Sequence, residues 1–218
     1  MAIADSPSAD RVPDPGEPSH IGPKLREQRK RRGVSLRALA ERIGVSPSLI
    51  SQIERGKVNP SVSTLWALVT ELGLTMGEVF DAPPDRGSPF ADGLLVTSMG
   101  PVAMPETRAV MNLAAGVRWE RLITRSDPLV EFVYVVYDVG ATSCPEDSLV
   151  RHGGREYGYV ISGHLGVQIG FDRYELGPGG SISFDSSAPH RLWAAGDEPV
   201  HGIWVVVGRQ NDPRLPAG

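Results

Sequence analysis

The chain has 218 residues, 40% hydrophobic and 22% charged, which is typical of a globular protein with enough chain for two small domains. No apolar run approaches the roughly 18 residues that span a membrane, and residues 1–20 lack the apolar core of a signal peptide. The single cysteine, Cys144, excludes an internal disulfide. Together these features favour a cytoplasmic protein with no membrane partner.

The net charge of −4 hides an uneven distribution. Residues 1–20 and 83–218 carry net charges of −3 and −5. Residues 21–82 hold ten Lys or Arg against six Asp or Glu and are net +4. Local charge, not total charge, decides whether a segment can contact phosphates. An acidic chain with one basic segment is therefore compatible with DNA binding by that segment.

Changes in composition and periodicity along the sequence predict two domains. Residues 1–20 are rich in Pro, Gly and acids and are expected to form a disordered tail, whereas residues 21–82 have helical periodicity. Residues 83–93 form a Pro/Gly/Asp linker, and 94–210 are expected to form an all-β barrel or sandwich before a tail at 211–218. The β-rich runs are Val117–Ile123, Val130–Val139, Tyr157–Ile161, Gly166–Ile169, Ser181–Phe184 and Ile203–Val207.

Residues 34–57 predict two helices joined by a tight turn. Ser35 stands at an N-cap position and Gly44 just past the helix end. Ser46 and Pro47 then occupy the N-cap and first position of the next helix. Apolar residues repeat at helical spacing in the first helix, at Leu36, Leu39, Ala40 and Ile43, and again further on, at Val62, Leu65, Val69 and Leu72. A capping box at Thr75–Glu78 opens a short last helix.

A longer motif, A-x3-G-[VT]-S-x3-[IL]-S-x2-E-x-G, runs through the same segment and is matched by Ala40, Gly44, Ser46, Ile50, Ser51, Glu54 and Gly56. Residues 23–80 therefore resemble the Cro-type, xenobiotic-response-element family of DNA-binding domains. The resemblance implies a five-helix, repressor-like helix-turn-helix domain. In that family the helix after the turn enters the major groove and its N-terminal residues face the bases.

The resemblance assigns base contacts to Pro47, Ser48, Ser51 and Gln52. Gln can bond adenine through two hydrogen bonds, Ser can serve either base, and Pro offers only apolar contact. For the serines the alternative is an ordinary solvated helix surface. Phosphate contacts are expected near the groove rim, from Ser35, Arg37, Arg55, Lys57, Ser61 and Thr64. Glu54 is acidic beside DNA and is expected to be structural, paired with Arg42 or Arg55.

A second pair of motifs lies further along the chain. His152-x3-Glu156-x6-Gly163 and the later Pro189-His190 resemble the two motifs of the cupin family, which implies a double-stranded β-helix barrel over about 94–209. The match is incomplete. Val150 stands at the usual first His position, and the Pro and inner Gly of the second motif are replaced by Asp185 and Ser187.

His152, Glu156 and His190 remain as candidate metal ligands. Two imidazoles and one carboxylate form the facial set that suits Fe(II) and can hold Zn or Mn. If both lie on one strand, Glu156 faces the same way as His152, because side chains alternate with a period of two. The alternative is a His–Glu hydrogen bond in a barrel that has lost its metal.

Other candidate residues have plainer expected roles. His164 follows Gly163 at a predicted hairpin turn and is expected to be solvated. His201 is expected at the surface and Cys144 as a buried, inert thiol. The tryptophans Trp119, Trp193 and Trp204 are expected in the core.

The domain order favours a sequence-specific transcription regulator. It would bind a double-stranded DNA operator as a homodimer paired through the β-domain, and its cupin would sense a small-molecule effector. The alternative is a non-haem iron enzyme resembling hydroxypropylphosphonate epoxidase, with the helices as a substrate lid and Lys24 as a possible catalytic lysine. A third hypothesis is a DNA-binding protein whose cupin only dimerises.

Overall fold

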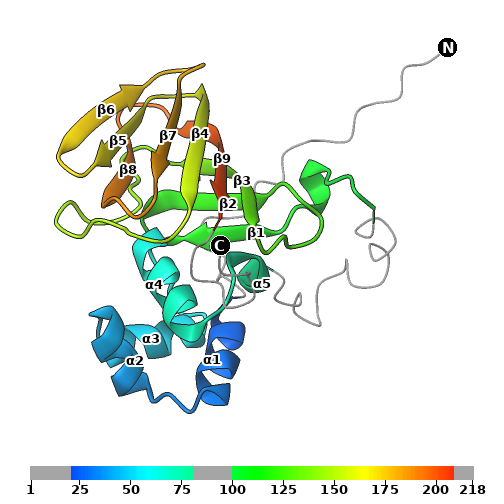
Figure 1. The fold of residues 1–218 in the computed structure, drawn as a ribbon, viewed down its shortest axis with the longest axis vertical. Coiled ribbons are helices and arrows are strands. Elements are labelled where there is room, and N and C mark those ends of the chain that lie inside the picture. The colour runs from blue at the N-terminus through cyan, green and yellow to red at the C-terminus, as the bar shows by residue number, and fades with distance from the viewer. Residues whose placement is uncertain (1–20, 81–99, 209–218) are drawn as a thin grey trace.

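The computed structural model describes residues 21–80 and 100–208 (Figure 1). The predicted tails at 1–20 and 211–218 and the linker at 83–93 lie outside these residues. The described N-terminal part folds as α1 (Ile21–Arg31), α2 (Leu36–Ile43), α3 (Pro47–Glu54), α4 (Val62–Leu72) and α5 (Met76–Phe80). This is the predicted five-helix arrangement. No helix among the described residues has the length and apolar character needed to cross a membrane.

The helix boundaries follow from the predicted caps. The Oγ atoms of Ser35 and Ser46 each accept a hydrogen bond from a backbone amide three residues on, at 3.1 Å. Gly44 ends α2 with φ of 70°, a left-handed conformation that glycine adopts without strain. The Thr75 amide donates to Glu78 at 2.6 Å, and the Glu78 amide donates to Thr75 Oγ1 at 3.2 Å. The predicted capping box is thus confirmed.

The partner predicted for Glu54 was wrong. Glu54 pairs with Arg29 of α1, not with Arg42 or Arg55, through contacts of 2.6 Å from Nε and 2.9 Å from Nη2. Because Glu54 is the last residue of α3 and is buried, its carboxylate faces inward toward α1, where the guanidinium neutralises it. Arg42 instead reaches Glu71 on α4. The prediction that Glu54 is structural agrees with this burial.

The C-terminal part is an antiparallel β-domain. Its strands are β1 (Val110–Leu113), β2 (Val117–Arg121), β3 (Val130–Tyr137), β4 (Arg155–Ser162), β5 (Leu165–Ile169), β6 (Asp172–Leu176), β7 (Ser181–Asp185), β8 (His190–Ala194) and β9 (Val200–Val207). One sheet has the order β1-β2-β3-β9-β4-β7 and the other β6-β5-β8. The two sheets form the predicted cupin-like barrel (Figure 1). Sequence patterns did not predict β1, β6 and β8.

Alternation along the strands separates the barrel interior from its outer surface. In β4, Glu156, Gly158 and Val160 face inward while Tyr157 and Tyr159 are exposed. Gly158 lies against the Trp204 ring, and a Cβ at this position would collide with the indole. The glycine therefore leaves room for Trp204 to lie across the barrel interior.

The helical domain is docked on the barrel through α4 and α5. Figure 1 shows these two helices between the barrel and the remaining helices. Backbone amides at the start of each helix take part in the contact. The hydrogen bonds across the junction include Ser63 N to Ser143 O at 3.3 Å and Gly77 N to Glu131 Oε1 at 3.2 Å.

Candidate functional sites: a recognition helix and an interdomain cavity

The first candidate site is the outer surface of α3. Ile50 and Ile53 point into the helical core, which leaves the predicted base-contacting residues on the other side. Pro47 and Ser48 are exposed, and Ser51 and Gln52 are half-buried. A short helix that packs against α1 and α2 and keeps uncharged side chains outward has the shape needed to enter a major groove.

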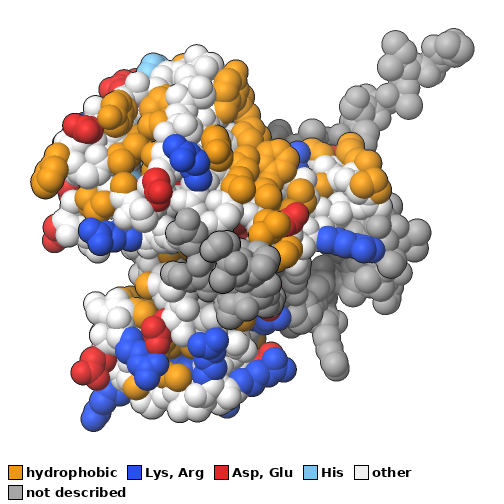
Figure 2. Space-filling model, viewed as in Figure 1, with side chains coloured by type: hydrophobic (Ala, Val, Ile, Leu, Met, Phe, Trp, Pro, Cys, Tyr) orange, Lys and Arg blue, Asp and Glu red, His pale blue; other side chains and the backbone are white. Residues whose placement is uncertain are grey.

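The predicted phosphate contacts surround this helix. Arg37, Arg55 and Lys57 are exposed, and Figure 2 shows Lys and Arg side chains gathered over the helical domain. The guanidinium of Arg55 donates to the Ser51 carbonyl at 3.0 Å, so it lies along α3. The remaining predicted contacts, Ser35, Ser61 and Thr64, lie at helix N-termini, where Ser35 and Ser61 also act as caps.

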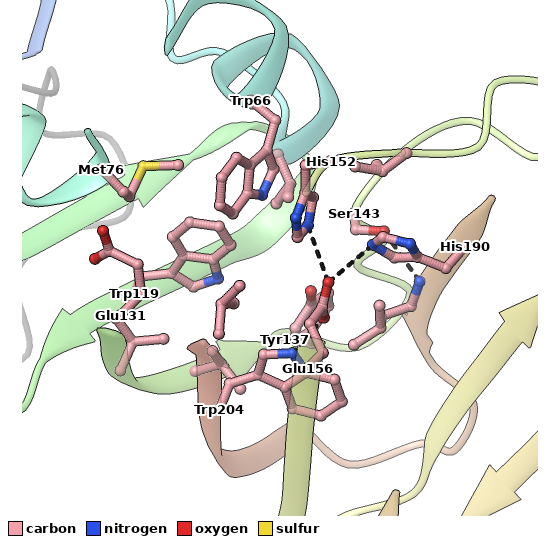
Figure 3. Close-up of a pocket in the computed structure, with 16 residues that line it drawn as sticks. Trp66, Met76, Trp119, Glu131, Tyr137, Ser143, His152, Glu156, His190 and Trp204 are labelled. Carbon is pink, nitrogen blue, oxygen red and sulfur yellow. Dashed lines mark hydrogen bonds and ion pairs between the residues drawn. The ribbon is translucent and has the colours of Figure 1, made fainter. Parts of the chain in front are cut away.

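The second candidate site lies inside the barrel, where the three predicted ligands meet. His152 Nε2 lies 2.9 Å and His190 Nε2 lies 3.2 Å from the same oxygen, Oε1 of Glu156. One ligand atom from each residue lies within 4.8 Å of the others. The three side chains are at most 4% exposed (Figure 3).

The route by which His152 reaches this cluster differs from the prediction. His152 does not share a strand with Glu156, because β4 begins at Arg155. It lies in the preceding loop, where Gly154 has φ of 106°, a conformation open to glycine. The turn at Gly154, not strand alternation, brings His152 beside Glu156. His190 arrives from the first position of β8.

Hydrogen bonds around the cluster orient both imidazoles. His152 Nδ1 lies 3.1 Å from the Gly153 carbonyl and His190 Nδ1 lies 2.9 Å from the Ala188 carbonyl. A carbonyl can only accept, so each Nδ1 carries its proton and each Nε2 is directed at Glu156. Trp204 Nε1 donates to the other Glu156 oxygen at 2.6 Å.

This donor set fits a divalent metal ion. With Nδ1 protonated, a neutral imidazole presents a lone pair at Nε2, and two such lone pairs would face a carboxylate oxygen that itself has no donor in hydrogen-bonding geometry. The conflict is relieved either by protonating the imidazoles or by placing a cation among the three atoms. Val150, at the position of the missing His, lines the cavity as an apolar wall. The set therefore offers three ligands and an open side.

Electrostatics agree with a tightly coupled cluster. Burial alone would raise the pKa of Glu156, but the contacts with His152 and His190 outweigh it and hold the pKa well below its ordinary value. For His190, burial alone would lower the pKa, but Glu156 and the Ala188 carbonyl outweigh it and raise the pKa. Burial raises the pKa of Tyr137, which lines the same cavity, so its phenol stays protonated.

The cavity beside the cluster is walled by both domains. Trp66 of α4 stacks on His152 with ring centroids 3.9 Å apart and an interplanar angle of 13°. Val62 of α4 also lines the cavity, as does Met76 of α5, which is labelled in Figure 3. Neither sequence motif predicted a site role for Trp66. The only hint in the sequence was that Trp66 is a bulky aromatic next to the apolar stripe Val62, Leu65, Val69 and Leu72. That stripe already accounted for the buried face of the helix.

The tryptophans predicted as core residues divide between two places. Trp119 and Trp204 are buried as predicted, but both line the cavity. The prediction that Trp193 lies in the core was wrong. Alternation along β8 puts it on the less buried side, where it is half-buried and packs against Gly166 and Arg191, away from the cavity.

Other candidates fall outside the cavity. His164 is exposed between β4 and β5, as predicted. His201 lies on the outer face of β9, where its Nδ1 is 2.8 Å from the Tyr134 hydroxyl. Cys144 is a buried free thiol, and burial raises its pKa. Lys24 of α1 is not among the residues that line the cavity.

Comparison with known proteins supports both domains. A helix-turn-helix family model matches residues 25–79 and a cupin-domain model matches residues 133–206. The HTH-type transcriptional regulator PuuR of Escherichia coli is 28% identical over 78% of this chain and 84% of its own length. SutR, a second HTH-type regulator of that organism, is 26% identical over 81% of this chain and 88% of its own.

A solved structure supports the arrangement of the fold. The HTH_3 family transcriptional regulator from Vibrio cholerae aligns with a TM-score of 0.60 and 24% identity, over 89% of this chain and 98% of its own. The alignment spans both domains.

Proposed function

We propose that this chain, a transcriptional regulator with a Cro-type helix-turn-helix domain followed by a cupin domain, binds a specific operator as a homodimer and responds to a small molecule held in the cupin cavity. The observation that carries the proposal is the contact between the two sites: Trp66, from a helix of the DNA-binding domain, stacks on His152 of the cavity. A ligand beside His152 therefore meets the DNA-binding domain directly.

Base contacts are assigned to the exposed side of α3. Pro47, Ser48, Ser51 and Gln52 are the proposed base readers, with Arg37, Arg55 and Lys57 positioned for phosphates around them. One such helix contacts few bases, so we propose two copies related by a two-fold axis on a pseudo-palindromic site.

The proposed dimer contact is the outer face of β4. Tyr157, Tyr159 and Ile161 are 45%, 48% and 46% exposed there, and Figure 2 shows hydrophobic side chains gathered on this part of the barrel. Their partners across the ladder, on β7 and β9, are Ser181, Ser183, Ile203 and Val205, so the face is free of charge at its centre. An uncharged apolar face that is the same in each copy suits a self-complementary, two-fold contact.

Sedimentation of matched tyrosine variants tests the dimer. Tyr159→Lys should shift the protein toward monomer, because it places a charge at the centre of the β4 face. Tyr174→Lys on β6, where the tyrosine is 47% exposed, is the control and should leave the dimer intact. Equal behaviour of the two variants would contradict the β4 interface.

The proposed metal ligands are His152, Glu156 and His190. A divalent Fe, Zn or Mn ion held there would supply a Lewis-acidic centre with an open side toward the cavity. The chain's own residues orient the ligands through the Gly153 and Ala188 carbonyls and exclude water with the surrounding tryptophans.

Selection of genomic fragments by the purified protein, at a fixed near-physiological salt concentration, tests the proposed function. Salt is fixed because non-specific phosphate binding weakens steeply as it rises. The expected result is enrichment of a pseudo-palindrome with half-sites about one helical turn apart. Absence of enrichment from folded, dimeric protein would contradict it.

The second candidate function is a metal-dependent cupin enzyme like hydroxypropylphosphonate epoxidase. The His152, Glu156 and His190 set favours it, since that ligand set supports iron oxidation chemistry. The catalytic lysine expected from the helical domain is not provided within one chain, because Lys24 does not line the cavity. Failure of operator selection would make this hypothesis the next to test.

A further inference from the structure

The cavity has two kinds of wall. Most of its lining comes from barrel strands that are joined in continuous hydrogen-bonded ladders, including Val133 and Val135 of β3 and Val206 of β9. Loop residues Ser143, Val150 and His152 complete the barrel side, where their amides are hydrogen-bonded to Leu192, His190 and Ser186. The other wall comes from Val62, Trp66 and Met76, which belong to the helical domain. Moving a β3 or β9 side chain requires distortion of a ladder, whereas moving the helical wall requires only that the two domains separate.

The cavity is small. Its volume is about 40 Å³, room for roughly two or three water molecules at ~15 Å³ each. A metal ion fits in such a space, but an organic effector does not. Protein interiors are close-packed and transmit displacement instead of absorbing it. A larger ligand must therefore move a wall, and the helical wall is the one that yields.

The chemistry of the cavity restricts what the ligand can be. Trp119 Nε1 is a buried donor without a hydrogen-bond partner, and Figure 3 shows it on the side of the indole that faces the Glu156 cluster. Trp204 Nε1 is already bonded to Glu156, and Glu131 accepts from the Gly77 amide. The rest of the lining is largely aliphatic or aromatic. Glu156 Oε1 also has no donor, but it faces the two imidazoles of the proposed metal site. Outside that cluster the open polar group is the Trp119 donor, and it calls for an acceptor.

We propose that the cavity is a ligand site shared by both domains, that its ligand is a compact apolar molecule bearing one oxygen acceptor for Trp119, and that binding displaces Trp66 and undocks the DNA-binding helices from the barrel. This inference rests on the proposed function, in which the cupin cavity holds the effector. It adds the class of ligand and the structural step that links the cavity to the operator.

Displacement of Trp66 reaches the recognition helix through the helical core. The helix that carries Trp66, α4, packs against α1 and α2. Helix α3 packs against the same two helices, and α5 packs against α1. The five helices therefore move as one body when α4 moves. In a two-fold dimer, undocking changes the relative placement of the two recognition helices, so ligand and operator binding are thermodynamically coupled.

Three small probes that share a phenyl ring and differ in their polar group test the ligand class. Benzoate and benzamide present oxygen acceptors, whereas benzylammonium presents only donors and a positive charge. Calorimetry on the full chain with zinc, which fills the Glu156 cluster in the proposed function, is expected to show binding of the first two and not the third. Trp119→Phe keeps the ring and removes the N–H, and should weaken binding about five- to tenfold. Preference for benzylammonium, or equal binding by Trp119→Phe, would overturn the assigned class.

Amide hydrogen exchange tests the displacement. The Ser63 and Gly77 amides bond across the domain junction, so undocking should expose both. Saturating benzoate is expected to accelerate their exchange at least tenfold. Val133→Phe, which fills the cavity from the barrel side, should do the same without a probe. Binding that leaves both amides protected would overturn the displacement step.

Removing the wall provides the matched comparison. Trp66→Ala opens space without domain separation, so benzoate should bind at least tenfold more tightly while losing its effect on operator affinity. Trp193→Ala, which truncates a tryptophan outside the cavity, should behave as wild type. If neither benzoate nor benzamide binds to the wild type or to Trp66→Ala, the shared site is overturned.

The amide measurements need no operator. If fragment selection fails while the Ser63 and Gly77 amides respond to probe, the regulator hypothesis fails and the shared site stands. If an operator is found and the amides do not respond, the shared site fails and the regulator stands.

Discussion

Two buried glutamates in this molecule have opposite surroundings. Glu54 and Glu156 have 5% and 4% of their side chains exposed, and each is ion-paired. Glu54 faces one guanidinium, Arg29, which meets both of its oxygens. Glu156 faces two imidazoles at a single oxygen, beside a cavity. Burial and pairing therefore do not by themselves distinguish a structural carboxylate from a candidate ligand.

The two glutamates differ in whether their partners can release a proton. Arginine keeps its proton at all accessible pH values, so the Arg29–Glu54 pair is complete and has no open position. The imidazoles of His152 and His190 can release protons and leave lone pairs directed at one point. A buried carboxylate becomes a candidate site when its partners are titratable and a cavity adjoins it.

The largest effect is expected from breaking the structural pair. Glu54→Ala leaves the Arg29 guanidinium buried without a counter-charge, which should lower the free energy of unfolding by about 3–5 kcal/mol. Glu71→Ala breaks the Arg42–Glu71 pair, which is partly exposed, and should cost at most about 1 kcal/mol. Urea denaturation of both variants measures the free energy of unfolding. Equal losses of that free energy would contradict the assigned role of Glu54.

The next effect is loss of metal stabilisation. Zinc at one hundred times its dissociation constant should stabilise the wild type by about 2.7 kcal/mol. His152→Ala should abolish this gain, because it removes one of three ligands. His164→Ala, in an exposed turn, should retain it. Thermal denaturation with and without zinc is the test, and an unchanged zinc response in His152→Ala would remove this residue from the site.

A smaller effect, on DNA alone, separates the recognition helix from its scaffold. Gln52→Ala should cost about 1–3 kcal/mol on the operator and relax one base preference. Lys57→Ala should weaken specific and random DNA alike and reduce the salt dependence by about one phosphate contact. Neither variant should change stability as Glu54→Ala does. Binding titrations at several salt concentrations decide, and equal loss by Gln52→Ala on random DNA would contradict base readout.

Much of the fold was predictable because its signals are local. Capping residues such as Ser35, Ser46 and Thr75 accept hydrogen bonds from amides three residues away, and the structure confirms them. The partner of Glu54 is 25 residues away, and no local pattern indicates it. Strand β6 was missed because four of its five residues are exposed, so it has no apolar alternation.

The candidate metal ligands could be predicted from the sequence, but the residues that wall the cavity could not. Motif spacing identified His152, Glu156 and His190, which the structure brings together. Trp66 belongs to the other domain, and the Trp66–His152 stack depends on how the two domains dock, which neither sequence motif encodes. The turn at Gly154 was likewise missed, because strand alternation offered a sufficient explanation for the spacing.

The smallest expected effect is a pH dependence that the two glutamates do not share. Because the pKa of His190 is raised in the folded protein, its charge stabilises metal-free protein below its ordinary pKa of about 6.5. That contribution is lost as pH rises through the raised pKa. The depressed pKa of Glu156 changes the stability only in strong acid. The pKa of Arg29 is raised further above its high ordinary value, so the Glu54 pair does not titrate near neutral pH.

Urea denaturation between pH 5.5 and 8.5 should therefore show falling stability with rising pH in chelator. Zinc should reverse the trend, since its binding requires neutral imidazoles and releases their protons. Glu156→Gln removes the charge that raises the His190 pKa and should flatten both profiles. Glu71→Ala should retain them. A flat wild-type profile in chelator would show that the cluster does not hold a proton, and the comparison between the two glutamates would lose its chemical basis.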